Sequence, residues 1–119
     1  NNSQIERYTH VQFTKMSVPR NKSNISVYVY VPENLETFNK DVTLQDRKTK
    51  EKYKLTEAGT VISEKTATLT GLKVGDTMTI TKDGKNYETK IITVTNNYMG
   101  HYIYMTGNDY EQTFEMKPN

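Results

Sequence analysis

The stretch NISVYVYV, residues 24–31, alternates strictly between two kinds of side chain. Aliphatic residues occupy its odd positions, from Ile25 to Val31, whereas its even positions include Tyr28 and Tyr30. A period of two with β-branched and aromatic residues is typical of a β-strand. Such a strand directs its aliphatic side chains toward one side of a sheet and its tyrosines toward the other. We therefore predict a two-faced strand that ends at the following proline.

A second stretch, NNYMGHYIYM at residues 96–105, repeats this two-faced pattern. It predicts another strand, with one face directed to the core and one face of tyrosines. The core-directed face is formed by Met99, His101, Ile103 and Met105, and the other face by Tyr98, Tyr102 and Tyr104. If the two strands are neighbours, their phenols share one side of the sheet.

The clearest local signal is DTMTITKDGKNYETKIITV, residues 76–94. Asp83 and Gly84 separate two alternating runs, and an Asp-Gly pair in that position is a strong indication of a tight β-hairpin. A two-residue loop places Ile80 opposite Tyr87. The two adjacent isoleucines later in the second run predict a bulge or a stretch that is covered on both sides.

Short helices are predicted around these strands. Ser63 is placed as the N-cap of a helix over residues 64–69, and Gly71 as the residue that ends it in a left-handed conformation. Ala67 and Leu69 are expected on the buried side of this helix. A second helix is expected over Gly107–Phe114, capped by the preceding threonine.

The remaining segments complete the expected architecture. Residues 32–41 are compatible with one or two helical turns, and residues 42–55 with a charged, exposed hairpin that turns at DRKTK. Because strands outnumber helices, we predict a mainly β (α+β) fold. The expected form is a small antiparallel sheet or partly open β-barrel with one or two short helices over an open end.

The 119 residues suit a single domain. We expect a polar N-terminal strand and linker over residues 1–24, with SVPRNKSN at 17–24 as the linker, and a core over residues 25–115. The first residue is not Met, and both ends of the sequence are polar. These features are those expected of a piece cut from something longer, although processing would give the same appearance.

Composition excludes several classes of function. The chain has no cysteine, which rules out disulfides, thiolate catalysis and zinc–thiolate sites. Its net charge of +2, from 16 basic and 14 acidic residues, gives no reason to expect a nucleic-acid partner. It also lacks a run of about 18 apolar residues, so no segment is expected to span a bilayer.

The search for chemistry finds no catalytic, cofactor-binding or metal-binding residues to nominate. No Gly-x-Ser-x-Gly motif occurs, and nothing places His10 or His101 beside a nucleophile. Met99, His101 and Met105 are soft ligands of the kind that bind Cu(I). However, six residues of extended strand separate the two methionines by about 20 Å, which favours a core role instead.

The tyrosines remain as a candidate interface. Tyrosine is enriched at protein interfaces because it buries a large area while its hydroxyl keeps a polar partner. The alternative is a second small core that is covered by a helix or by residues 1–20. The candidate interface residues are Tyr28, Tyr30, Tyr98, Tyr102 and Tyr104.

Several motifs, in this order, resemble one protein family: VYVYVPENLETFNKDVTLQDRKTKEKYKL, GTVISEKTATLTGLKVGDTMTI, KDGKNYETKI and NNYMGHYIYM. Together they are similar to an extracellular domain of large FtsX-like ABC transporter permeases from Gram-positive bacteria. The similarity runs from about Val27 to Phe114. Its most specific parts are residues 61–65, 71–76 and 97–105, followed by Tyr110 and the terminal phenylalanine.

The resemblance implies a non-enzymatic module on the extracellular face of the cell membrane. Its partners would be the rest of the permease with its transmembrane helices and, indirectly, a cytoplasmic ATP-binding subunit. An extracellular protein, lipid or peptide substrate is a further possible partner. Movement would be transmitted mechanically, without a cofactor. The alternative is a free-standing secreted binding module or adhesin domain with the same β-rich fold.

Overall fold

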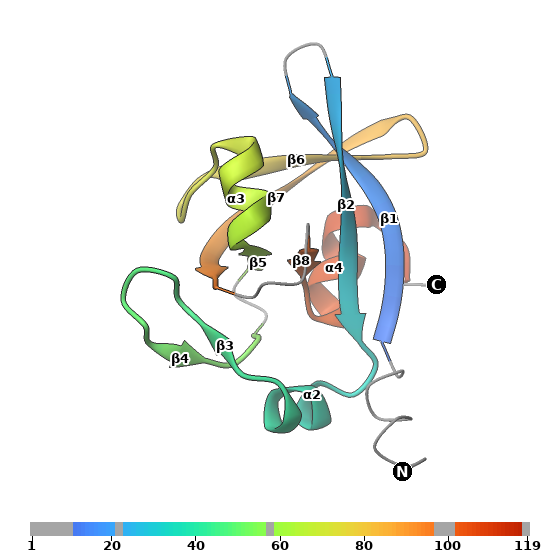
Figure 1. Ribbon diagram of the computed structural model, residues 1–119. Coiled ribbons are helices and arrows are strands. Elements are labelled where there is room, and N and C mark those ends of the chain that lie inside the picture. Colours follow the sequence, from blue (N-terminus) through green and yellow to red (C-terminus); the bar gives the residue numbers. More distant parts are fainter. Residues whose placement is uncertain (1–10, 21–22, 57–58, 97–101, 118–119) are drawn as a thin grey trace.

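The computed structural model describes residues 11–20, 23–56, 59–96 and 102–117. Within these residues the chain forms β-strands and three short α-helices, which confirms the predicted mainly β fold class (Figure 1). In chain order the elements are β1 (Val11–Arg20), β2 (Ser23–Pro32), α2 (Leu35–Asp41), β3 (Leu44–Gln45), β4 (Lys52–Tyr53), β5 (Thr60–Ser63), α3 (Glu64–Thr70), β6 (Thr77–Lys82), β7 (Lys85–Thr95), β8 (Tyr102–Tyr104) and α4 (Gly107–Phe114).

Six strands form a closed barrel in the order β1-β2-β8-β5-β7-β6. The barrel closes where Ser17 of β1 pairs with Thr81 of β6. The predicted barrel was partly open, and the structure corrects this point. Closure removes the unpaired edges that an open sheet leaves exposed to other chains.

The barrel is mixed, which differs from the predicted antiparallel sheet. Strand β2 runs parallel to β8, and β5 runs parallel to β7. The second of these pairings follows from the connection between the strands. The chain leaves β5 through α3 into β6, and the hairpin then returns β7 alongside β5 in the same direction. Such pairings join strands that are not consecutive, so local sequence patterns do not reveal them.

Local signals are reproduced closely. The Asp-Gly hairpin has the predicted register, with Ile80 opposite Tyr87. The predicted irregularity lies beside the paired isoleucines, because Thr60 pairs with Ile91 while the next residue of β5 pairs with Thr93. Ile92, which has no partner in this ladder, packs on the outer side of the barrel, whereas Ile91 lies in the barrel core. Both isoleucines are therefore covered.

The predicted linker over residues 17–24 is wrong, because strand β1 continues to Arg20 and β2 begins at Ser23. The ladder runs through this segment, with Val18 paired to Ile25. Val18 is also buried. Pairing between adjacent strands and burial thus place Pro19 and Asn24 in the ladder despite the turn preference of these residue types.

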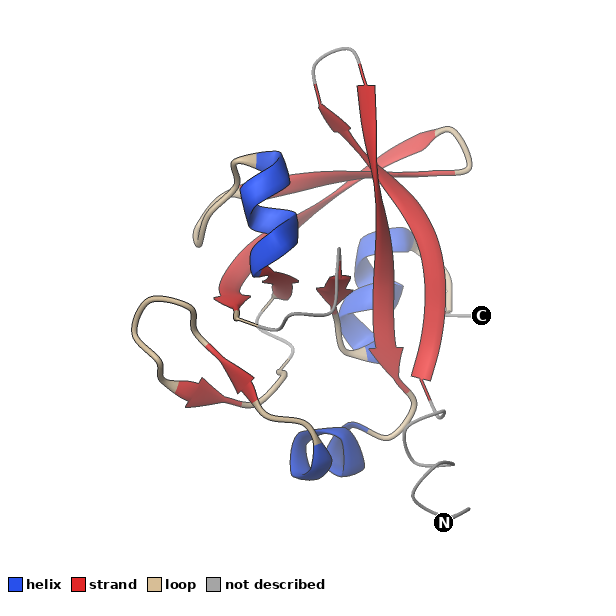
Figure 2. Cartoon of the chain, in the orientation of Figure 1, coloured by secondary structure: helices blue, strands red, loops and turns tan. Residues whose placement is uncertain are grey.

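The barrel interior is the main hydrophobic core. Helix α3 contributes Ala67 to it, and α4 contributes Tyr110 and Phe114. Figure 2 shows α3 and α4 flanking the barrel, whereas α2 lies below, near the β3–β4 ribbon. The buried strand residues of this core are Met16, Val18, Val27, Val29, Val31, Ile62, Met78, Ile80, Ile91, Val94 and Ile103, with Met105 directly after β8.

Helix α3 has the predicted caps but not the predicted buried face. The Ser63 side chain accepts a hydrogen bond from the Thr66 amide, and Gly71 ends the helix with a φ of 75°. Ala67 is buried as expected, whereas Leu69 is 40% exposed. Two residues separate these positions, which is about 200° around an α-helix. Because Ala67 faces the barrel, Leu69 faces solvent.

Candidate functional site

The predicted tyrosine face exists and is built by two neighbouring strands. Strands β2 and β8 pair in parallel, with Tyr28 opposite Tyr102 and Tyr30 opposite Tyr104. The intervening pair is Val29 and its partner isoleucine, both fully buried in the barrel core. Strand alternation therefore places the aliphatic residues inside the barrel and the four tyrosines outside it.

These four residues, Tyr28, Tyr30, Tyr102 and Tyr104, form one continuous group that we call the aromatic face. Ring centroids are 5.4 Å apart for Tyr30 and Tyr104, and 5.9 Å apart for Tyr30 and Tyr102. The Tyr28 and Tyr102 centroids are 6.1 Å apart. These separations are typical of tilted and edge-to-face aromatic pairs, which add to the stability gained from burial alone.

Exposure changes steadily across the aromatic face. Tyr104 is 3% exposed, and Tyr28 at the other end is 36% exposed. Tyr30 and Tyr102 are intermediate. The inner end of the face is thus core, and the outer end is surface.

Helix α2 covers the inner end of the aromatic face. Its Phe38 ring lies 6.0 Å from Tyr30 and 6.5 Å from Tyr104, measured between centroids. Together with residues from the β3–β4 ribbon it closes a second hydrophobic core outside the barrel. The buried members of this second core are Phe38, Leu44, Leu55, Val61 and Tyr104.

Hydrogen bonds fix α2 over this core. Asn34 caps the helix by accepting from the Thr37 amide at 2.9 Å. The Asn39 side chain donates to the Leu55 carbonyl at 3.1 Å and accepts from the Leu55 amide at 2.9 Å. A single side chain therefore satisfies both backbone groups of Leu55, as a paired strand would. Helix α2 is therefore held over the second core by these hydrogen bonds as well as by the packing of Phe38.

The structure therefore divides the predicted site. Tyr104 belongs to the second core, which matches the alternative of a core covered by a helix. Tyr28 and the outer parts of Tyr30 and Tyr102 remain accessible, and their role as an interface stays a prediction. Phe38 was not among the predicted site residues. The spacing of Leu35 and Phe38 indicated a helix, but no local pattern shows which tyrosines that helix contacts.

Other predicted positions lie outside the described residues. These include Tyr98 of the candidate interface, and Met99 and His101 of the copper alternative. Met105 is fully buried in the barrel core. Among the residues that the structure describes, no group of three or more His, Cys, Asp or Glu side chains is placed to hold a metal ion.

Two side chains of the described segments have clearly shifted pKa values, and neither belongs to the aromatic face. The Thr49 amide donates to the Asp46 carboxylate and holds the pKa of that carboxyl below its usual value. The hydrogen bond to Asp83 raises the pKa of the Lys82 ammonium. Each shift comes from a partner within the same turn, so both groups have local structural roles.

Comparison with solved structures finds a protein of similar fold. The fold is similar to the crystal structure of the extracellular domain of the noncanonic ABC-type transporter YknZ from Gram-positive bacteria, with a TM-score of 0.64 and 15% sequence identity. The match covers 92% of this chain and 58% of that one, so this chain spans somewhat more than half of the longer chain. At 15% identity the comparison establishes a shared fold. No protein-family model and no curated protein match the sequence.

In the described segments, no helix has the length and apolar character needed to cross a membrane.

Proposed function

We propose that this chain is a non-enzymatic extracellular domain of an ABC-type transporter permease. The observation that carries the proposal is the structural match to such a domain over 92% of the chain. The ordered motifs between Val27 and Phe114 independently resemble the extracellular domains of FtsX-like permeases. Sequence motifs and three-dimensional fold thus support the same assignment.

In this role the aromatic face contacts another part of the permease or an extracellular partner. Tyr28 and Tyr102 lie side by side on parallel strands with ring centroids 6.1 Å apart. Exposed neighbouring tyrosines offer apolar area with little conformational entropy to lose, which is why they serve well in binding surfaces. The buried inner end of the same face anchors these rings to the second core.

The fold also suits mechanical coupling to a cytoplasmic ATP-binding subunit through transmembrane helices. Displacement of the aromatic face acts on β2 and β8, and both are hydrogen-bonded members of the closed barrel. Because the barrel has no free edge, a force on two strands is shared by all six. The domain would therefore move as one body.

Topology of the full-length parent protein tests the assignment. The chain contains no cysteine, so single cysteines introduced at exposed Thr68 and Lys85 provide unambiguous labels once any cysteines elsewhere are replaced. We expect a membrane-impermeant maleimide to label both positions in intact cells. Labelling only after lysis would contradict an extracellular location. A parent with a signal peptide and a wall-anchoring tail would instead support the adhesin alternative.

The interface is tested separately in the assembled transporter. A photo-crosslinking amino acid at Tyr28 should form adducts with another segment or protein. Leu69 is the matched control, because it is 40% exposed but lies on α3, outside the aromatic face. Equal crosslinking at the two positions would exclude a specific role for the aromatic face, whereas the topology result would be unaffected.

A further inference from the structure

A second candidate site lies outside the aromatic face. The turn between β3 and β4 and the loop between α3 and β6 enclose a hollow of about 280 Å³. These two segments lie on the same side of the molecule (Figure 1). No sequence pattern predicted this hollow, because the two segments that form its walls are far apart along the chain. The lining residues are Asp46, Arg47, Lys48, Thr49, Lys73, Val74 and Val94.

The first wall is held in place by its own hydrogen bonds. One Asp46 carboxylate oxygen accepts from the Lys48 amide at 2.8 Å and from the Thr49 amide at 2.9 Å. The Arg47 amide donates to the Val94 carbonyl at 3.0 Å, which ties the turn to β7. The backbone that carries Arg47 and Lys48 is therefore fixed on the barrel before any ligand binds.

The opposite wall is also fixed to β7. The Gly75 amide donates to the Ile91 carbonyl at 2.8 Å, and the Lys73 amide donates to the Asp76 carboxylate at 2.9 Å. Val74 in this loop is 51% exposed, and Val94 is buried. The hollow thus has an apolar side between its charged groups.

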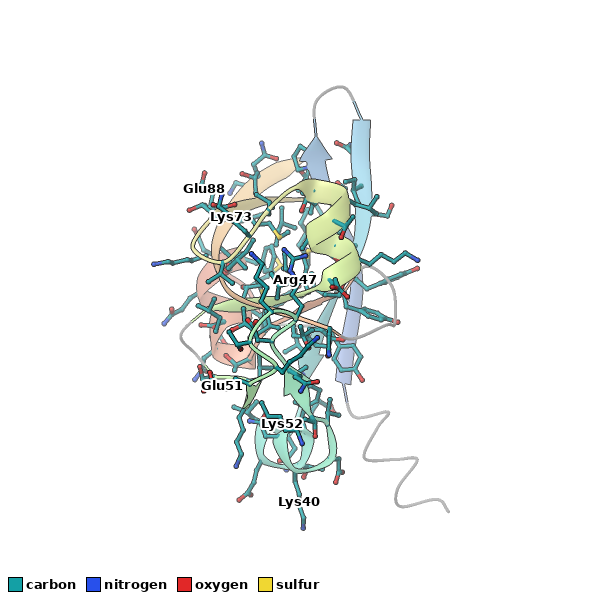
Figure 3. All side chains as sticks on the ribbon, turned by 60° about the vertical axis from the view of Figure 1, so that its left-hand side comes forward. Lys40, Arg47, Glu51, Lys52, Lys73 and Glu88 are labelled. Atoms are coloured by element: carbon teal, nitrogen blue, oxygen red, sulfur yellow. The ribbon has the colours of Figure 1, made fainter. Side chains whose placement is uncertain are left out.

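The charged groups of the hollow are only partly compensated. The Arg47 guanidinium makes no hydrogen bond or close ion pair with any residue that the structure describes, although its charge contributes to the lowered pKa of the adjacent Asp46 carboxyl. Lys73 is 73% exposed and has one long contact with Asp76, at 3.5 Å, which is worth little in water. Among the lining residues, the three cations of Arg47, Lys48 and Lys73 face the single carboxylate of Asp46, while Asp76, outside the lining, contacts Lys73. Figure 3 shows Arg47 and Lys73 on one face, with Arg47 below Lys73.

We propose that this hollow binds one carboxylate group carried by an acidic peptide segment of a partner protein. The planar guanidinium of Arg47 matches a carboxylate through two parallel hydrogen bonds, and Lys73 supplies a second positive charge. The net positive charge of the lining residues favours an anionic group. Val74 and Val94 of the hollow can contact an apolar side chain next to the acidic residue of the peptide. A phosphodiester is a different anionic ligand, and the polar glycerol units that often flank it would gain little free energy from contact with these valines. The site does not depend on the transporter assignment.

An NMR titration of the ¹⁵N-labelled 119-residue chain tests the proposal. The probe is acetyl-Leu-Glu-Leu-amide, and acetyl-Leu-Gln-Leu-amide is the uncharged control. We expect saturable shifts of the Arg47 side-chain Nε–H and of the Lys73 amide with the first peptide alone. Equal binding of the glutamine peptide, or no binding of either peptide, would overturn the proposal. Stronger binding of dimethyl phosphate than of the glutamate peptide would overturn the carboxylate assignment.

Matched variants locate the binding. Arg47→Met should weaken binding about tenfold or more, because the variant loses both the positive charge and the two hydrogen bonds to the carboxylate. The affinity of Arg47→Lys for the glutamate peptide should lie between those of wild type and Arg47→Met, since lysine keeps the charge but lacks the planar guanidinium. Lys73→Met is an independent test and should also weaken binding. The Lys73 side chain is largely exposed, so its replacement should leave the fold intact. Lys52, exposed and lower on the same face, lies outside the hollow, so Lys52→Met should bind as wild type. Equal weakening by Lys52→Met would indicate diffuse charge attraction and exclude a specific site.

Discussion

Tyr30 and Tyr104 lie opposite each other on the parallel strands β2 and β8, with ring centroids 5.4 Å apart. In the same row of tyrosines Tyr104 is buried, whereas Tyr28 is 36% exposed. One row of tyrosines thus serves as core at one end and as surface at the other. The two ends should respond differently to the same substitution.

Tyr104→Ser should destabilise the domain by about 3–5 kcal/mol, the usual cost of removing a buried aromatic side chain. Tyr28→Ser should cost less, about 1 kcal/mol, because Tyr28 is 36% exposed and loses less buried area than Tyr104. Chemical denaturation of the two variants measures both values. Equal losses would mean that the second core extends over the whole aromatic face and would weaken its assignment as an interface.

Ser63 links helix α3 to strand β8, and its loss should be costly. Its buried hydroxyl oxygen accepts from the Thr66 amide at 3.2 Å and from the Tyr102 amide at 3.2 Å. Ser63→Ala removes the acceptor of both hydrogen bonds and should destabilise the domain by about 1–3 kcal/mol. Thr68→Ala, at an exposed position of the same helix, should change stability by less than about 0.5 kcal/mol. Similar thermal denaturation midpoints for the two variants would contradict this prediction.

Gly59 is required by a close approach to β7. An added Cβ would lie 2.5 Å from the Ile92 Cγ2 atom and 2.9 Å from the Lys90 carbonyl oxygen. Gly59→Ala should therefore destabilise the domain by about 1–3 kcal/mol through overpacking at the bulge. Gly107→Ala is the matched control, since nothing lies within 4 Å of its added Cβ and the residue begins α4. It should be neutral or stabilising by up to about 1 kcal/mol. The opposite order of unfolding free energies would refute the packing argument.

Asp46 should give the β3–β4 turn a pH-dependent stability. Its pKa in the folded chain is lowered from 3.8, mainly because the Thr49 amide donates to the charged carboxylate. The stabilisation is therefore complete above the unfolded-state pKa and is lost as pH falls through the lower folded-state value. Asp46→Ala should cost about 1 kcal/mol at pH 7.

This cost should shrink as the pH falls below 3.8, the ordinary pKa of the carboxyl, because the unfolded chain then binds a proton more readily than the folded carboxylate does. Asp46→Asn keeps an oxygen acceptor for the two amides and should retain most of the stability without the pH dependence. Urea denaturation of the three proteins at pH 7 and pH 3 provides the measurement. An Asp46→Ala cost that stays constant between these pH values would show that the ionised carboxylate has no part in the turn.

Local patterns in the sequence identified individual elements well. Alternation indicated that Tyr28 and Val29 face opposite sides of a strand, and Asp83-Gly84 set the hairpin register. Thr106 indicated the start of α4, where its side chain accepts from the Asp109 amide at 3.1 Å. Each of these features depends on residues only a few positions apart, whose geometry is fixed by backbone sterics and nearby hydrogen bonds.

Local sequence patterns are enough to predict a mainly β protein, with valines and isoleucines on one side of its strands and tyrosines on the other. The parallel pairing of β2 with β8, the closure between Ser17 and Thr81, and the division of the tyrosines between core and surface follow from the folded arrangement of distant segments. The same holds for Arg47 and Lys73, which line one hollow. These outcomes depend on contacts between distant residues, which are selected by burial of the whole barrel against the entropy of closing long loops. No short stretch of sequence is therefore enough to predict these contacts.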